Sequence, residues 1–500
     1  MGEGVEYGVT SDHDHLTNLQ PVIEAMGATE YLKATVGDEL TTAEMGHFNG
    51  FPLAFDPASP EDGAPDWQAQ SKFNSSLSGE PLPHLTPVEI YDALRAAGRY
   101  TPEETVVQNN HPRDGLLGNF YMYSVDLQTG DAAADSNALA MLHDVVVPEH
   151  FSFEFDAIEM SNGKHQELIR TPTIEEVRAF NEDGSGTIYS ALARTAAEQE
   201  ALRTGQTGLN SSYAGALDDW MNWLNQGRRY TATGNSDSHW QTDEAGVPRN
   251  YLRSTTDLPD FIDEREMAAS IHEGRVSHSY GPFIELWAVA DGGTGEIGDT
   301  VADDDGVVDL RIRVQSPTWF KVDRIEVYQN GVMICSIEGD HTCNEPADNY
   351  GLFHPNEQVV NFDGTITVDM ADYWMLSTPD DFAPLPAEHG LPVDSWFSVV
   401  AMGDDSTAPL AREPTREPIR FADILTGSLG AIRFEDMTST LLSGIDISLG
   451  ADFHKVFPII PWGMTNAVFV DLDGDGEWVE PGLPLYVTWY DWQAMEEAAE

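Results

Sequence analysis

The hydrophobic positions of residues 1 to about 280 come in short runs that alternate with amphipathic stretches, which is typical of an α/β fold. Apolar runs predict strands at residues 7–10, 105–109 and 156–160, and each run ends in polar residues. Between Leu217 and Leu224 the apolar residues recur at helical spacing, so we expect an amphipathic helix with its aromatic side chains in the core. Polar residues that follow parallel strands collect at the carboxyl edge of a sheet or barrel, where active sites are commonly built.

Near residue 281 the pattern changes to a period-two alternation interrupted by Gly, Asp and Asn. The alternation predicts antiparallel strands at residues 307–314, 322–328 and 396–402, with a hairpin turn at Asn330-Gly331. We therefore expect an α/β domain over residues 1–280, a β-sandwich-like domain over 281–410 and a C-terminal extension over 411–500.

The chain is strongly acidic, with 25 Lys and Arg against 85 Asp and Glu and a formal net charge of -60. It contains no cluster of basic residues, so we do not expect nucleic acid as a partner. No apolar run approaches the roughly 20 residues of a membrane-spanning helix, so we expect no membrane span. Acidity of this extent fits either high solubility or a high-salt environment, in which counterions screen the self-repulsion. Nothing in the sequence indicates an oligomeric state.

Cys335 and Cys343 flank a turn-like stretch and could close a small hairpin loop through a disulfide. Such a bond favours an extracytoplasmic location, as does the acidic surface, whereas a reduced pair in the cytosol is equally compatible with the spacing. The first residues contain neither the basic region nor the apolar region of a secretory signal. The sequence leaves the compartment open between these alternatives.

Several histidines in the first half of the chain stand beside carboxylates or turn residues, outside any apolar stripe. Imidazole and carboxylate are ligands that zinc, manganese and iron accept in proteins, and a shared carboxylate allows two ions to be held together. The candidate ligands are His13, Glu39, His47, His111, Asp237 and His239.

The order of the motifs around these ligands resembles that of the PHP (polymerase and histidinol phosphatase) metallohydrolases over residues 5–282. Within that superfamily, the residue sequences of three motifs are most similar to those of the carbaryl-hydrolase-type (CehA/McbA-like) branch. These motifs are Gly-His-Phe-Asn, Asn-His-Pro-Arg and Thr-Gly-Asn-Ser-Asp-Ser-His. Residues 465–476 also resemble the C-terminal region of that branch. The motifs are Ser11-Asp-His-Asp-His15, Gly37-Asp-Glu39 with Gly46-His47, Asn110-His-Pro-Arg113, Ile158-Glu-Met-Ser-Asn-Gly163 and Gly234-Asn-Ser-Asp-Ser-His239.

The resemblance implies a distorted seven-stranded α/β barrel whose strand ends hold two or three divalent ions (Zn, Mn or Fe). A metal-bound hydroxide would attack an ester beside Glu39 and Asp237. By position, Glu39 would bridge two ions, His47 and His111 would complete one of them, and Asp237 would share the other. His13 and His239 would serve a further ion. Residues expected to bind substrate or to support the ligands are Asp12, His15, Arg113, Asn162 and Arg249.

One departure from the family concerns the start of the chain. PHP proteins begin with a His-x-His motif at the end of their first strand, upstream of the segment matched by Ser11-Asp-His13. The pair His13 and His15 has the same spacing, but its surroundings fit the second motif better. We therefore expect an incomplete barrel that lacks two histidine ligands, and correspondingly weak activity.

The acidic loop near the C-terminus contains Asp471, Asp473 and Asp475 followed by Gly476, which matches the first half of a calcium-binding loop. The twelfth position of this loop is Gly482, whereas a complete EF-hand has Glu there. The alternatives are a calcium site and a solvated acidic turn.

Taken together, these features favour a metal-dependent hydrolase of a small-molecule ester: a phosphoester, or a carbamate or carboxylic ester. The alternative is a catalytically impaired PHP-fold protein that serves as an extracellular binding or surface module. A polymerase-associated proofreading domain is disfavoured, because its polyanionic substrate would meet a chain of net charge -60.

Overall fold

The structure of the chain is a computed structural model that describes most of its residues. The described residues are 4–42, 44–114, 117–127, 129–133, 146–171, 215–239, 245–318, 320–337, 359–370, 394–403, 459–472 and 474–482.

The N-terminal part is built on a curled six-stranded sheet in the order β1-β2-β3-β4-β5-β6. β3 runs antiparallel to both of its neighbours, whereas the pairs β1–β2, β4–β5 and β5–β6 are parallel. The strands expected at residues 7–10, 105–109 and 156–160 are confirmed, although the first continues through Ser11, Asp12 and His13. The strands are β1 (Tyr7–His13), β2 (Lys33–Thr41), β3 (His47–Phe51), β4 (Val106–Asn109), β5 (Ala157–Asn162) and β6 (Thr231–Asn235).

Helices flank this sheet. The expected amphipathic helix is confirmed as α8, in which Trp220 and Trp223 are buried. Helix α2 begins with Pro87 and carries a capping box between Thr86 and Glu89, the arrangement that satisfies the first amide groups of a helix. The helices are α1 (Gln20–Ala25), α2 (Pro87–Ala96), α3 (Asn119–Met122), α8 (Ala216–Leu224) and α9 (Glu264–His272), and short 3₁₀ turns lie at Pro60–Gly63, Pro102–Glu104, Pro148–His150, Gln166–Leu168 and Pro259–Phe261.

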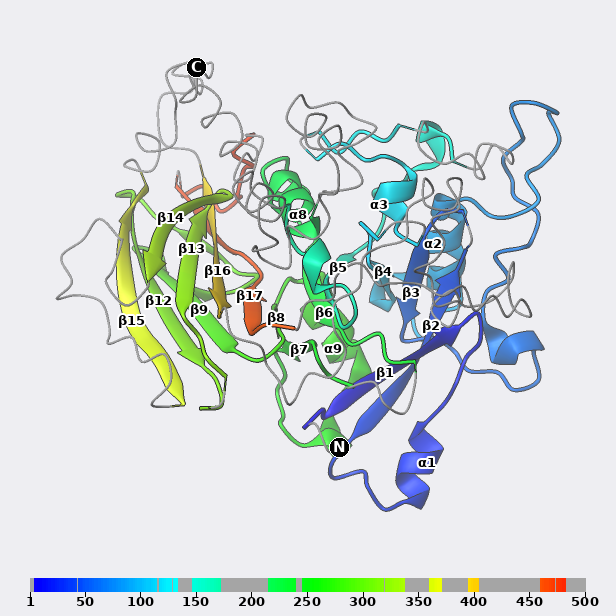
Figure 1. The fold of residues 1–500 in the computed structure, drawn as a ribbon, viewed down its shortest axis with the longest axis horizontal. Helices are drawn as coiled ribbons and strands as arrows, with labels where there is room; N and C mark the ends of the chain where they lie inside the picture. The colour runs from blue at the N-terminus through cyan, green and yellow to red at the C-terminus, as the bar shows by residue number, and fades with distance from the viewer. Residues whose placement is uncertain are drawn as a thin grey trace, which may run out of the picture.

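Two further sheets form the other half of the molecule, with α8 between them and the curled sheet (Figure 1). One has four strands in the order β10-β9-β12-β15, and the other follows the order β11-β18-β16-β17-β8-β7, with the β13–β14 hairpin attached to β16. The strands expected at 307–314, 322–328 and 396–402 are confirmed. The strands are β7 (Arg249–Leu252), β8 (Val276–Ser279), β9 (Phe283–Ala290), β10 (Gly293–Glu296), β11 (Thr300–Ala302), β12 (Val307–Gln315), β13 (Arg324–Gln329), β14 (Val332–Ile337), β15 (Val360–Asp369), β16 (Ser395–Met402), β17 (Trp462–Thr465) and β18 (Val468–Asp471).

Apolar side chains from both of these sheets form one core, to which β12 contributes Leu310 and Ile312 and β16 contributes Val399. The larger sheet also takes strands from outside residues 281–410, because β8 pairs with β17. The fold is therefore mixed α/β and mostly strand, with a curled half-barrel sheet and two sheets that share a core. The finer expectations of a seven-stranded barrel and a β-sandwich remain predictions.

Two other expectations concern the compartment. Among the described residues, no helix is long and apolar enough to cross a membrane. Cys335 is buried in β14, and its expected partner Cys343 lies outside the described residues. The disulfide remains a prediction.

Candidate metal centre

The first three candidate ligands lie together because of how their strands pair. His13 is the last residue of β1 and stands in register with Glu39 of β2, so the two side chains leave the sheet at the same edge. His47 is the first residue of β3 and lies opposite Thr41. Because β3 is antiparallel to β2, its first residue reaches the edge at which β1 and β2 end.

The remaining ligands follow the later strands at the same edge. His111 comes two residues after β4, and Asp237 comes two residues after β6. Their φ angles are 29° and 49°, in the left-handed region that non-glycine residues rarely adopt. Such backbone is held only where the surrounding structure over-determines it, and it clusters at functional sites.

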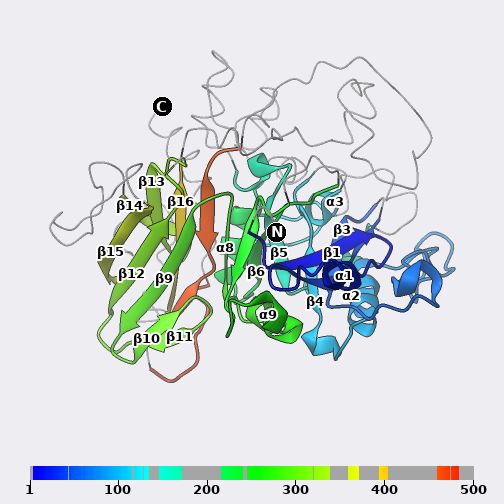
Figure 2. The same ribbon diagram turned by 90° about the horizontal axis from the view of Figure 1, so that it is seen from below.

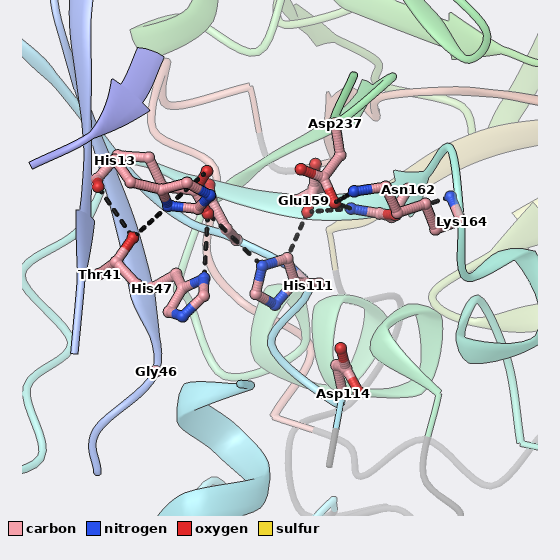
Figure 3. Close-up of polar contacts among 12 residues, drawn as sticks. His13, Thr41, Gly46, His47, His111, Asp114, Glu159, Asn162, Lys164 and Asp237 are labelled. Atoms are coloured by element: carbon pink, nitrogen blue, oxygen red, sulfur yellow. Dashed lines mark hydrogen bonds and ion pairs between the residues drawn. The ribbon is translucent and has the colours of Figure 1, made fainter. Parts of the chain in front are cut away.

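Glu39 is at the centre of this group. Its Oε1 lies 3.1 Å from Nδ1 of His47 and 3.6 Å from Nε2 of His111, and its Oε2 lies 3.6 Å from Nδ1 of His13. Ligands held about 2.0 Å from one tetrahedral ion lie about 3.3 Å apart, so the separations of Glu39 from His47 and His111 are those of ligands that share an ion. Figure 3 shows the three imidazoles converging, with Asp237 and Glu159 on the far side of His111. His13, Glu39 and His47 could therefore hold a metal ion, since their ligand atoms all lie within 4.8 Å of one another.

The two ends of the curled sheet meet at a pair of histidines. Nε2 of His13, on β1, lies 3.0 Å from Nε2 of His239, which follows β6. β1 and β6 lie at opposite ends of the strand order, so only the curl of the sheet brings these residues together. The structure thus brings His13 and His239 together, and their shared metal role remains a prediction.

Thr41 orients the His13 ring. Its hydroxyl donates to the carbonyl of Glu39 over 3.0 Å, and Nδ1 of His13 lies 2.5 Å from the same hydroxyl oxygen. The hydroxyl has one hydrogen, so Nδ1 of His13 must be the donor in this second bond. Nε2 of His13 then keeps its lone pair, which is the form that binds metal.

Lys164 places a cation beside Asp237 and His239. Reasoning from the sequence did not identify this lysine. Its Nζ lies 3.3 Å from Oδ2 of Asp237 and 2.6 Å from Nδ1 of His239. Asn162, an expected supporting residue, donates to Asp237 over 3.3 Å and to Glu159 over 3.1 Å. Only the turn after β5 brings Lys164 to this position, and no local pattern in the sequence indicates that turn.

Glu159 is a second residue whose contribution was missed, although its segment was among the motifs. It is buried on β5, and its Oε2 accepts the amide hydrogen of His111 over 2.6 Å. Burial raises the pKa of Glu159 to about 7. Glu159 therefore fixes the backbone that presents His111.

Burial and hydrogen bonding set the charges of the ligands. Burial alone would raise the pKa of Glu39, but hydrogen bonds from two neighbouring imidazoles hold it well below its usual range. Burial would lower the pKa of His111, yet the hydrogen bond to Glu39 and nearby carboxylates raise it to about 9. Burial lowers the pKa of His47. Burial alone would raise the pKa of Asp237, but the charge of Lys164 together with those of His239 and His111 lowers it below its usual value. The centre thus holds two anionic carboxylates beside imidazoles.

The other expected supporting residues lie in different surroundings. Arg113 is buried and forms a two-point ion pair with Asp219 of α8; of its two expected roles, this contact fits support of the ligands, because it holds the loop that carries His111. Asp12 is exposed, and Nε2 of His15 lies 3.5 Å from Asp62.

Arg249 begins β7, and its Nε donates to the carbonyl of Gly246 over 2.7 Å. This contact does not connect Arg249 to the metal ligands, and its expected role in substrate binding or ligand support remains a prediction.

The acidic loop at 471–476 is held by its own backbone. The carboxylate oxygens of Asp471 accept the amides of Gly474 and Gly476 over 2.9 and 2.7 Å. Asp475 caps the amide of Glu477, and Asp473 lies outside the described residues. Calcium binding by this loop remains a prediction.

No family model, curated protein or solved structure matches this chain.

Proposed function

We propose that residues 5–282 form a metal-dependent hydrolase of a small ester, of the PHP type and the CehA/McbA-like branch that their motifs resemble. The observation that carries this proposal is the convergence of three imidazoles on the buried carboxylate of Glu39, with nitrogen–oxygen separations of 3.1 to 3.6 Å. A mixed set of imidazole and carboxylate suits Zn, Mn or Fe.

The roles of the chain's own residues follow from their contacts. When bound, a divalent ion supplies Lewis acidity and lowers the pKa of water from 15.7 towards about 7. Glu39 offers an anionic carboxylate between the imidazoles, and Thr41 holds His13 in its metal-binding form. Lys164 and Asn162 fix the carboxylate of Asp237 on the opposite side. Ligands held in this way need little rearrangement, which favours both binding and catalysis.

The ammonium group of Lys164 bears on the substrate class. It is the one cationic group of fixed charge within 4 Å of Asp237 or His239 among the described residues, with its side chain mostly buried. A positive charge at the centre favours a substrate whose ester carries a negative oxygen. A phosphoester fits this best, and a carbamate or carboxylic ester, whose oxygen becomes negative during attack, fits next.

The same lysine favours a second candidate function. Lys164 stands beside both Asp237 and His239, where the resemblance implies a metal ion. An ammonium group there competes with a cation for the same ligands. A catalytically impaired binding or surface module that keeps one ion at Glu39 is the corresponding alternative.

The test combines metal content with hydrolysis. The full chain, supplied with Mn²⁺, is assayed on nitrophenyl phosphate, bis-nitrophenyl phosphate and nitrophenyl acetate, and its metal is measured by elemental analysis. Glu39→Gln should lose metal and at least about a hundredfold in activity, whereas exposed Glu103→Gln should match the wild type. Metal without hydrolysis would favour the binding module, and near-zero metal in the wild type would refute both candidates.

A further inference from the structure

Three aspartates lie together at one end of the β-rich half of the molecule. Asp291 begins the turn between β9 and β10, and Asp303 and Asp305 follow β11. Their carboxylate oxygens lie within 4.8 Å of one another, and we call these three residues the Asp303 cluster. Figure 2 shows β10 and β11 side by side at this end, on the opposite side of the molecule from β1 and α2. The cluster is thus separate from the metal centre.

Backbone contacts hold the cluster in place. The amide of Gly292 donates to the carbonyl of Ala302 over 2.9 Å, which brings the turn after β9 against the end of β11. A Cβ atom on Gly292 would lie 2.7 Å from that carbonyl oxygen, so this close approach requires glycine. The amide of Asp303 donates to the carbonyl of Asp471 over 2.8 Å. Ala302 and Asp303 therefore tie the end of β11 to both β-rich sheets.

The carboxylate of Asp303 provides an independent indication of a ligand. The residue is only 1% exposed, and its Oδ2 accepts the amide of Gly306 over 2.8 Å. Its Oδ1 is buried and has no hydrogen-bond partner. Among the described residues, no Lys or Arg forms an ion pair with any of the three aspartates. A buried carboxylate oxygen left in this state is costly unless a cation or a proton neutralises it.

We propose that Asp291, Asp303 and Asp305 bind one calcium ion. Three carboxylates offer up to six oxygens, and Ca²⁺ takes six to eight oxygen ligands in flexible geometry. Mg²⁺ usually binds through only one or two carboxylates and keeps its waters, and zinc prefers nitrogen and sulfur ligands. The bound ion joins the β9–β10 turn to the loop after β11. It thereby stabilises the end at which the two sheets meet.

This site differs from the acidic loop at 471–476. Both oxygens of Asp471 already accept amides of their own loop. In the Asp303 cluster, by contrast, Oδ1 of Asp303 has no hydrogen bond of normal geometry, although the backbone of Asp291 also faces this carboxylate. The affinity of the chain for calcium should therefore fall when residues of the Asp303 cluster are substituted, and it should not change when Asp475 is substituted.

Calorimetric titration of the full chain with Ca²⁺, in salt that screens the charge of -60, tests the proposal. We expect one site whose affinity falls at least tenfold in Asp303→Asn and in Asp305→Asn. Asp304→Asn, an exposed neighbour outside the cluster, and Asp475→Asn should bind as the wild type does. Thermal melting of the wild type should shift upward with calcium, and that of Asp303→Asn should not.

Several outcomes would overturn the site. Unchanged affinity in both cluster variants would do so, as would a loss confined to Asp475→Asn, which would place calcium on the acidic loop. Weak binding shared by all variants would indicate surface charge alone. Asp305 is exposed, so Asp305→Asn decides between these outcomes even if circular dichroism shows that Asp303→Asn does not fold.

Discussion

At the scale of single residues, the metal centre depends on how each ligand is held. Nδ1 of His13 is committed to Thr41, and the amide of His111 is held by Glu159. Glu39 contacts three imidazoles, so its charge determines whether the group attracts a cation or repels one. The raised pKa of His111 means that a proton occupies the metal-free centre at neutral pH.

Metal affinity should therefore depend on pH through His111. Its pKa of about 9 lies above the usual value for histidine, so the ring is protonated below that pH and must lose its proton to bind metal. The apparent affinity for Mn²⁺ should rise about tenfold per pH unit from about pH 7 and flatten near pH 9. Calorimetric titration at several pH values measures this slope.

Two variants check the assignment of that slope. His111→Gln should bind metal more weakly and with a smaller dependence on pH. His272→Gln, at the end of α9, should keep the slope of the wild type. An affinity that does not change over this range in the wild type would contradict the assignment.

At the scale of elements, the loop after β4 is anchored by α8. Arg113 follows His111 by two residues, and its guanidinium is fully buried against Asp219. It also donates to the carbonyl of Val125 over 3.0 Å. Helix α8 thus supports the metal centre through its ion pair with Arg113. Strand β3 contributes His47 to the centre because it runs antiparallel to β2.

Removal of this pair should destabilise the protein and weaken metal binding together. Asp219→Ala leaves the Arg113 charge buried and unpaired, which costs about 3 to 5 kcal/mol in similar buried pairs. Urea unfolding measures the loss, and elemental analysis should show less bound metal because the loop that carries His111 is loosened. Asp92→Ala, exposed on α2, should change stability by no more than about 0.5 kcal/mol. A loss below about 1 kcal/mol in Asp219→Ala would show that the pair is dispensable.

At the scale of the whole molecule, the two halves share a sheet. β8, which precedes residue 281, pairs with β17 near the other end of the chain. The side chain of Asn466 also accepts from the amide of Ala232 and donates to the carbonyls of Ala232 and Val276, each over 2.8 Å. One residue of the C-terminal region thus ties β6 to β8.

Separation of the chain at residue 281 should therefore damage both fragments. Fragment 281–500 would lose the partner of β17, and fragment 1–280 would leave the backbone groups of β8 without the partners that β17 provides. We expect each fragment to show reduced near-ultraviolet circular dichroism and faster proteolysis, with partial recovery when the two are mixed. A cooperative melt of fragment 281–500 at the temperature of the full chain would contradict this expectation.

The sequence by itself determined part of the local structure of the described residues. Period-two alternation identified β12, β13 and β16, and helical spacing identified α8, because burial of one face depends on neighbours a few residues apart. Residue chemistry likewise indicated the ligands, since few side chains bind metal. The order of their motifs indicated that they belong together.

Only the tertiary structure decided which distant residues meet. The contact of His13 with His239 needs the curl of the whole sheet, and the position of Lys164 needs the turn after β5. Arg113 was expected either to bind substrate or to support the ligands; a buried charge requires a partner, and only the fold shows that α8 supplies Asp219. These contacts join segments far apart in the chain, and their energies depend on burial and closure, which no local pattern of residues encodes.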